Sequence, residues 1–120
     1  MADQSKIEFI ELMKSRTKNI SLVALKIFRK IRKTEEGKIV ARQFLRSALS
    51  VGANYRAACR GRSRAEFFAK LSIAVEEADE VQFWIEIMQE SQIIDFEIED
   101  FKKELNQVLA ILSKARKNTK

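Results

Sequence analysis

Four acidic residues lie close together in the sequence, at Glu76, Glu77, Asp79 and Glu80. Carboxylates on helices can hold two metal ions, but that chemistry also needs Glu-x-x-His pairs on facing helices, and the chain has no histidine. The same absence removes the usual general base of a serine or cysteine triad, and the three glycines form no phosphate-binding loop. We therefore expect no catalytic residues, no metal, no cofactor and no small-molecule substrate.

The single cysteine, Cys59, excludes a disulfide within the chain. Its better interpretation is a small buried residue rather than a nucleophile. The first residues include acids at Asp3, Glu8 and Glu11, which is atypical of a signal peptide, and no later stretch approaches the roughly 20 apolar residues that span a bilayer. These features predict a soluble, cytoplasmic protein without a membrane segment.

The basic residues are distributed unevenly. Residues 37–65 hold seven basic residues and no acid, whereas residues 66–120 hold seven basic and twelve acidic ones, within a total of +6. On a helix with 3.6 residues per turn, five of the seven fall within about 40° of one line. The set, called the basic stripe below, comprises Lys38, Arg42, Arg46, Arg56, Arg60, Arg62 and Arg64.

Two interpretations of the basic stripe stay open. A surface helix normally mixes signs, so an acid-free stripe favours a polyanion such as RNA or DNA, bound through phosphate contacts. Alternatively, the arginines pair with the acids that follow, inside one subunit or between subunits, and the protein is a structural or protein-binding oligomer. A weaker third possibility is attachment to a membrane surface through the basic first helix, whose apolar face is, however, needed for the core.

Apolar residues recur at helical spacing through most of the chain, and sustained period-two alternation is absent. The sequence therefore predicts an all-α protein with one domain over residues 1–120. Short connections between long helices favour an antiparallel up-down-up-down four-helix bundle. The predicted helices cover residues 4–33, 38–60, 63–90 and 95–115, the first of them either continuous or broken near Thr17, Asn19 and Ser21.

Local signals place the helix boundaries. TEEGK (34–38) predicts a break with Gly37 as the turn residue, and Ser63 with Glu66 matches a capping box that opens the third helix. Asp95 is the expected cap of the fourth helix. The expected core faces contain Ile10, Met13, Ile20, Ala24, Ile27 and Ile31 in the first helix, Phe67, Leu71, Ala74, Ala78, Val81, Ile85 and Met88 in the third, and Phe101, Leu105, Val108 and Leu112 in the fourth.

Two further features concern packing. Gly52 lies inside the second helix, where glycine costs roughly 1 kcal/mol relative to alanine, so we expect another helix to approach its backbone closely. The third helix carries large apolar residues away from its core face, which predicts an interface between subunits of a homo-oligomer. The expected interface residues, which include two acids in need of an arginine partner, are Ile73, Glu77, Glu80, Phe83, Trp84 and Ile87.

Three segments carry a family resemblance: RQFLRSALSVGANYRAA (42–58), SRAEF (63–67) and EEADEVQFW (76–84). The sequence resembles a bacterial family of four-helix-bundle proteins encoded by intervening sequences within large-subunit ribosomal RNA genes, whose relatives include the accessory variability proteins of diversity-generating retroelements. The resemblance implies a homopentamer. In the retroelement relatives it implies a basic surface that binds nucleic acid and a reverse transcriptase, so this chain's possible partners include RNA, DNA, a reverse transcriptase or another protein.

The chain departs from the family pattern at two places. Ala57 stands where the family usually has a glutamate, so an acid that would temper the basic stripe is missing. The usual proline before the second helix is replaced by TEEGK. The first departure favours polyanion binding, and the hypothesis with most support is a non-catalytic, oligomeric nucleic-acid-binding adaptor that uses the basic stripe.

Overall fold

The computed structural model describes residues 3–119, which form four helices and no strand. The prediction of an all-α fold is therefore confirmed for this part of the chain. The helices are α1 (Gln4–Lys30), α2 (Glu35–Cys59), α3 (Arg64–Glu90) and α4 (Glu99–Lys117). None of them is long and apolar enough to cross a membrane.

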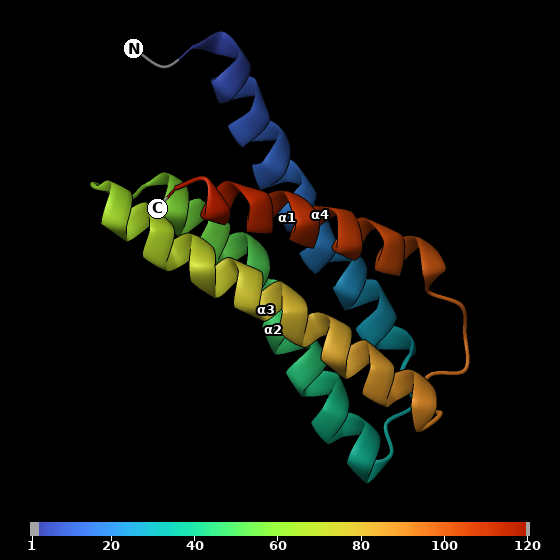
Figure 1. Ribbon diagram of the computed structural model, residues 1–120. Coiled ribbons are helices and arrows are strands. Elements are labelled where there is room, and N and C mark those ends of the chain that lie inside the picture. Colours follow the sequence, from blue (N-terminus) through green and yellow to red (C-terminus); the bar gives the residue numbers. More distant parts are fainter. Residues whose placement is uncertain (1–2, 120) are drawn as a thin grey trace.

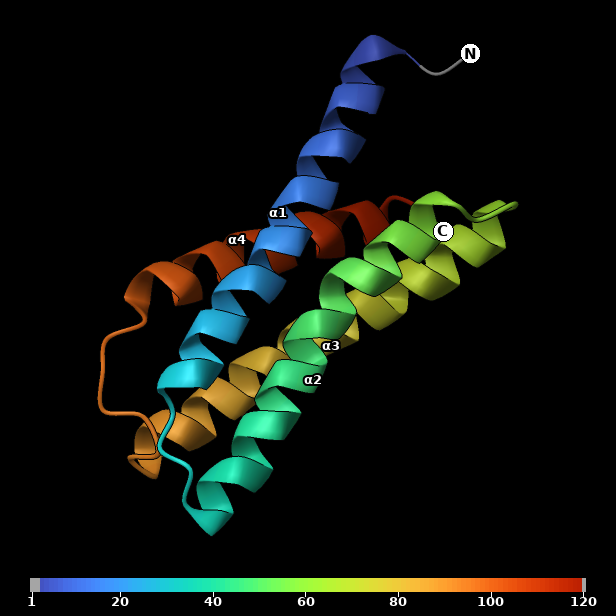
Figure 2. The same ribbon diagram turned by 180° about the vertical axis from the view of Figure 1, so that it is seen from behind.

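The four helices form a bundle in which each helix packs against two others. α2 contacts α1 and α3, and α4 contacts α3 and α1. α2 and α3 lie side by side and are joined at one end by the short turn before Arg64, as both views show (Figures 1 and 2). The first turns of α1 project beyond the other helices (Figure 1), which leaves Ile7, Phe9 and Leu12 exposed. The bundle is accordingly elongated, at 51 × 22 × 19 Å.

The core is built from the helix faces that the apolar periodicity predicts. On α3 the predicted face is buried from Leu71 to Met88, with Phe67 half-buried at its start, and on α4 all four predicted residues are buried. The rings of Phe44 and Phe101 meet edge to face with centroids 6.0 Å apart, which ties α2 to α4. On α1 the predicted face is buried from Met13 onward.

α1 is continuous, so the alternative of a break near its middle is wrong. The polar residues there satisfy their own hydrogen bonds. The Thr17 hydroxyl donates to the carbonyl oxygen of Met13 at 2.8 Å, and the Ser21 hydroxyl donates across to the carbonyl oxygen of Ala48 on α2 at 3.2 Å. The helix ends three residues before the predicted boundary, because Ile31 turns into an extended conformation and is buried.

The prediction that TEEGK is a break centred on Gly37 is wrong in its details. Thr34 is the N-cap of α2, and its hydroxyl oxygen accepts a hydrogen bond from the Gly37 backbone N–H at 3.1 Å. Gly37 lies inside the first helical turn, so α2 begins at Glu35 rather than at residue 38. The acids Glu35 and Glu36 then lie at the positive end of the helix dipole, where they are favourable.

The predicted boundary at Ser63 is confirmed, although the Glu66 half of the capping box bonds Arg62 instead of Ser63. The Ser63 hydroxyl oxygen accepts from the backbone N–H of Glu66 at 3.1 Å. The Glu66 carboxylate reaches back to the backbone N–H of Arg62 at 2.8 Å. Because both bonds are local, the sequence alone predicted this boundary.

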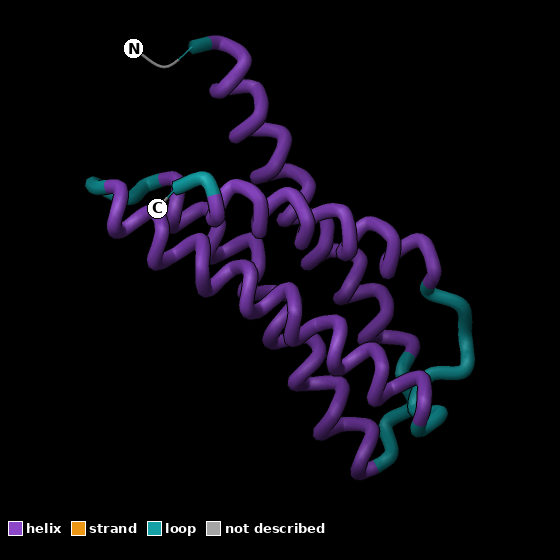
Figure 3. The backbone as a smooth tube through the Cα atoms, in the orientation of Figure 1, coloured by secondary structure: helices purple, strands orange, loops and turns teal. Residues whose placement is uncertain are grey.

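The predicted start of α4 is wrong. The connection after α3 extends to Ile98, the N-cap of α4, and the exposed Asp95 does not cap the helix (Figure 3). Burial decides this boundary: Ile94 and Ile98 are 5% and 6% exposed, so the segment between them passes over the core before the helix begins. Glu99 and Asp100 take the first turn of the helix, where the dipole favours acids.

The missing side chain of Gly52 lets the backbones of α1 and α2 approach each other closely. A Cβ atom added there would lie 3.2 Å from the carbonyl carbon and oxygen of Thr17. These atoms belong to the backbone of a helix and cannot move as a side chain can. The close approach expected from the mid-helix glycine is therefore present, with α1 as the approaching helix.

We predict that Gly52→Leu lowers the free energy of unfolding by about 1–3 kcal/mol, because a larger side chain would push the two backbones apart. Urea unfolding followed by circular dichroism measures this change. Ala53→Leu is the matched control, because Ala53 is exposed and should tolerate the same side chain with little change. Equal stability of the two variants would contradict the close-approach argument.

Candidate functional site

The structure leaves all seven side chains of the basic stripe at the surface. Lys38, Arg42, Arg46 and Arg56 lie on α2, and Arg60 is its C-cap. Arg62 lies in the turn, and Arg64 is the first residue of α3 rather than part of the loop. The stripe thus follows the outer side of α2 and continues around the turn to α3.

Arg46 differs from the other members of the stripe because its guanidinium is paired with acids. Its Nη1 lies 3.1 Å from Oε2 of Glu77, and its Nη2 donates to Oε1 of Glu80 at 2.6 Å. Both carboxylates lie on α3 of the same chain. The arginine partner expected for Glu77 is therefore found within the subunit, where it links α2 to α3.

The surroundings of the two carboxyl groups shift their pKa values in opposite directions. Burial raises the pKa of Glu77. Hydrogen bonds with Glu77 and then with Arg46 lower the pKa of Glu80, whose Oε1 also accepts from the indole Nε1 of Trp84 at 3.1 Å. Of the two carboxyl groups facing Arg46, Glu80 is thus the one whose ionised form the surroundings favour. The other two neighbouring acids, Glu76 and Asp79, are exposed.

The remaining members of the stripe have no carboxylate partner in residues 3–119. Only Arg64 is held by a hydrogen bond, from its Nε to the carbonyl oxygen of Thr119 at 3.0 Å. Elsewhere in the bundle an arginine does find an acid: Arg16 on α1 forms two hydrogen bonds with Glu104 on α4. Among the acids of the second half of the chain, Glu66 also lies at the stripe, but its carboxylate accepts from the backbone N–H of Arg62 and pairs with no stripe side chain.

Sequence reasoning missed two lysines that belong with the stripe in space. Lys14 and Lys18 of α1 line the same groove as Arg56 of α2. The sequence carries one signal, their spacing of four residues, which puts them on one side of a helix. That spacing could not show which residues of α2 they would face.

The predicted oligomer interface is partly exposed. Phe83 is 51% and Ile73 38% exposed, whereas Trp84 and Ile87 are half-buried. The rings of Phe83 and Trp84 meet edge to face, with their centroids 5.1 Å apart. Trp84 also packs against the core, which explains its partial burial. Phe83 is not among the residues that pack against the core, so the core does not explain its position.

The surroundings of two groups with potential reactivity disfavour their ionised forms. Burial raises the pKa of the Cys59 thiol, which is half-buried, and also raises the pKa of the Tyr55 hydroxyl one turn earlier on α2. A thiol with a raised pKa is a weak nucleophile near neutral pH. The described residues contain no cluster of three or more His, Cys, Asp or Glu side chains that could hold a metal ion.

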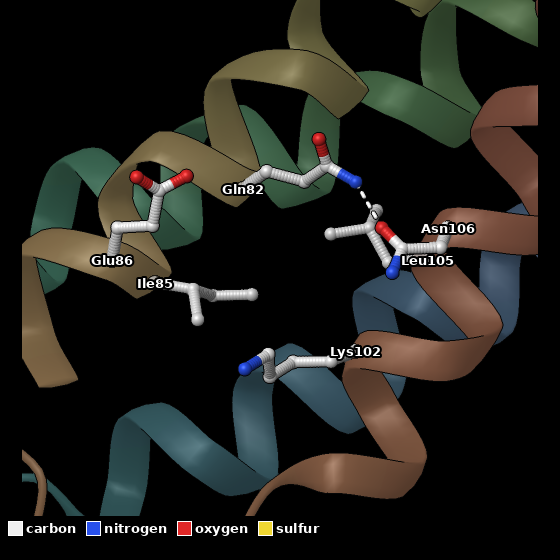
Figure 4. Close-up of a pocket in the computed structure, with 6 residues that line it drawn as sticks. All are labelled: Gln82, Ile85, Glu86, Lys102, Leu105 and Asn106. Atoms are coloured by element: carbon white, nitrogen blue, oxygen red, sulfur yellow. Dashed lines mark hydrogen bonds between the residues drawn. The ribbon is translucent and has the colours of Figure 1, made fainter.

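A small cleft of about 280 Å³ lies between α3 and α4 (Figure 4). Gln82 bridges it by donating to the amide oxygen of Asn106, and Glu86 and Lys102 lie on opposite walls. The Lys102 ammonium is bonded to Gln89 and Glu99 rather than to Glu86. Glu86 and Lys102 therefore form no hydrogen-bonded acid and base pair across the cleft.

We predict unequal effects of neutralising the two acids that face Arg46. Because the pKa of Glu80 is lower in the folded state, its ionised form stabilises the fold at pH values above the usual carboxyl pKa. This contribution is lost as the pH falls through the lowered pKa of the folded state. Glu80→Gln should therefore cost up to about 1 kcal/mol at pH 7 and little at pH 3.

Glu77→Gln is the matched control and should cost less at pH 7, because burial already disfavours the charged form of Glu77. Urea unfolding of both variants at the two pH values measures the difference. A larger loss of stability for Glu77→Gln at pH 7 would show that we have assigned the charged carboxylate to the wrong residue.

Comparison with known proteins places this arrangement in a family. The sequence pattern of the family described as 23S rRNA-intervening sequence protein matches residues 12–114. The fold is similar to a crystal structure of a protein with unknown function from the S23 ribosomal protein family of Bacteroides thetaiotaomicron, with a TM-score of 0.80 and 28% identity over 90% of this chain and 97% of that chain. No curated protein matches the sequence. The chain belongs to the 23S rRNA-intervening sequence protein family, as its sequence motifs predict.

Proposed function

We propose that the protein is a non-catalytic adaptor that binds RNA or DNA phosphates through the basic stripe. In this proposal the chain is an antiparallel up-down-up-down bundle, acts in the cytoplasm and assembles as a homo-oligomer. The pentameric state is implied by the family resemblance. Structured RNA is the first ligand to test.

One observation carries the proposal. Six of the seven basic side chains in the stripe are exposed and lack a carboxylate partner in the described part of the chain. Unpaired cationic side chains gathered on one side of an elongated molecule create a positive field that attracts polyanions. Five of these six are arginines, whose planar guanidinium can donate two hydrogen bonds to one phosphate.

In this proposal the members of the stripe have different roles. Arg42 and Arg60 are free of carboxylates and are suited to phosphate contacts. Arg46 already donates to Glu77 and Glu80, so moving it to a phosphate would leave both acids unpaired. Its expected contribution to nucleic-acid binding is therefore smaller than the sequence alone implied.

We predict that Arg42→Gln combined with Arg60→Gln weakens binding to RNA and DNA and lowers the slope of log K against log salt by about 0.7–0.9 for each phosphate that is no longer bound. The effect should depend little on base sequence, because phosphates carry no sequence information. Fluorescence anisotropy with a mixed panel of duplex and single-stranded ligands measures both quantities between low and moderate salt.

Lys103→Gln combined with Lys114→Gln is the matched control. It removes the same charge from exposed positions on α4, a helix that carries no member of the stripe. If the control reduces affinity and slope as much as the stripe variant does, net charge rather than the stripe accounts for binding. Absence of wild-type binding at low salt would contradict the proposed function itself.

The alternative is a structural or protein-binding oligomer, and the pairing of Arg46 with Glu77 and Glu80 favours it for that one arginine. Exposed Phe83 and Ile73 lie on the same helix as these acids and support a subunit interface there. A surface of this kind can coexist with nucleic-acid binding on the other arginines.

We predict that Phe83→Asp lowers the oligomer mass, because a buried unpaired carboxylate at an interface is costly. Light scattering after size-exclusion chromatography measures the mass. Leu22→Asp is the control, since Leu22 is similarly exposed but lies on α1. An unchanged mass for Phe83→Asp would exclude this residue from the interface.

A further inference from the structure

A narrow groove lies where α1 and α2 cross, next to the basic stripe. Its volume is about 150 Å³. The lining residues are Lys14, Lys18, Ser21, Gly52, Ala53 and Arg56. Three of these six residues are basic and none is acidic, which distinguishes this groove from the cleft between α3 and α4.

The floor of the groove is low because its residues are small. Gly52 has no side chain, and its position against the Thr17 backbone keeps the two helices close. Ala53 is exposed beside it and contributes only a methyl group. The Ser21 hydroxyl donates its proton to the Ala48 carbonyl oxygen, so the cations of the groove, and not this hydroxyl, are the available donors.

The rim of the groove is positive on both sides. Lys14 and Lys18 stand one turn apart on α1, and Arg56 stands one turn after Gly52 on α2. Neither Lys18 nor Arg56 makes an ion pair within residues 3–119. Lys14 has one partner, Glu11 at 3.2 Å, whose side chain is 65% exposed, and exposed pairs of this kind are weak.

We propose that this groove binds one backbone phosphate of the nucleic acid, with Lys14 and Lys18 on one side and Arg56 on the other. The inference rests on the proposed function and extends it from α2 to α1. The volume corresponds to about five water molecules, which suits a phosphate group and is below the roughly 300 Å³ typical of small-molecule pockets. Arg56 connects the groove to the rest of the basic stripe.

This assignment changes the expected path of the ligand. A strand bound only along α2 would follow the outer side of one helix. A phosphate seated between α1 and α2 instead draws the strand across the line where the two helices meet. The small residues of the floor then have a second consequence besides helix packing, because they let a phosphate come close to all three cations.

The decisive variant is Ala53→Glu, which places a carboxylate in the groove without removing any of its cations. Ala53 is exposed, so the fold should be retained, and circular dichroism checks this. Affinity for RNA and DNA at about 0.1 M salt should fall about tenfold, and the salt slope should decrease by about 0.7–0.9 because one phosphate is no longer bound. Lys18→Gln should lower the slope by a similar amount through removal of a cation.

Two controls separate charge from shape. Ala53→Gln has nearly the same size without the charge, so it shows the effect of filling the groove alone and should lose less affinity than Ala53→Glu does. Ala110→Glu adds the same charge at an exposed position on α4 and should leave the salt slope unchanged.

The outcomes distinguish this inference from the proposed function. If wild type binds but Ala53→Glu binds as tightly as Ala53→Gln with the same slope, the groove assignment is wrong and the function of the stripe stands. A further outcome is that inorganic phosphate protects Lys18 from acetylation while Ala53→Glu leaves the affinity for nucleic acid unchanged. In that case the groove binds only free anions, and the assignment to a backbone phosphate is wrong. If wild type binds no nucleic acid at low salt, both proposals fail.

Discussion

The backbones of α1 and α2 touch at Thr17 and Gly52, and the position of the charged surface depends on this contact. The missing side chain lets Ser21 reach the Ala48 carbonyl oxygen and brings the lysines of α1 beside Arg56. A longer side chain at Gly52 would separate these groups as well as weaken the core. A glycine inside a helix lowers the stability of that helix, but here it permits both the packing of α1 against α2 and the arrangement of the cations beside it.

On the side of α2 that faces α3, an ion-pair network adds to the packing of the two helices. Arg46 donates to Glu77 and Glu80, and Glu80 in turn holds the indole of Trp84. This network joins the basic second helix to the acidic third helix at one place. Because only one arginine of the stripe is used in this way, the remaining cations stay available at the surface.

The arrangement accounts for the absence of acids between residues 37 and 65. An acid on the outer side of α2 would neutralise a neighbouring arginine through pairs of the i, i+4 type. Ala57 lies three residues before Arg60, and a carboxylate there would be an i, i+3 neighbour of that arginine. The stripe and the groove together form one positive surface, and the acids of α3 pair with its side chains only at Arg46 within the described residues.

Helix type, core faces and the Ser63 boundary follow from the sequence by itself, because helical periodicity and capping hydrogen bonds involve residues within a few positions of one another. The sequence also excluded histidine-dependent chemistry, which depends on composition alone. The start of α4 needed the tertiary structure, since the burial of Ile94 and Ile98 overrides the local capping signal of Asp95. The partner of Arg46 and the meeting of Lys18 with Arg56 were likewise decided only by the fold, because periodicity tells which residues share a helix face but not which faces meet when helices cross.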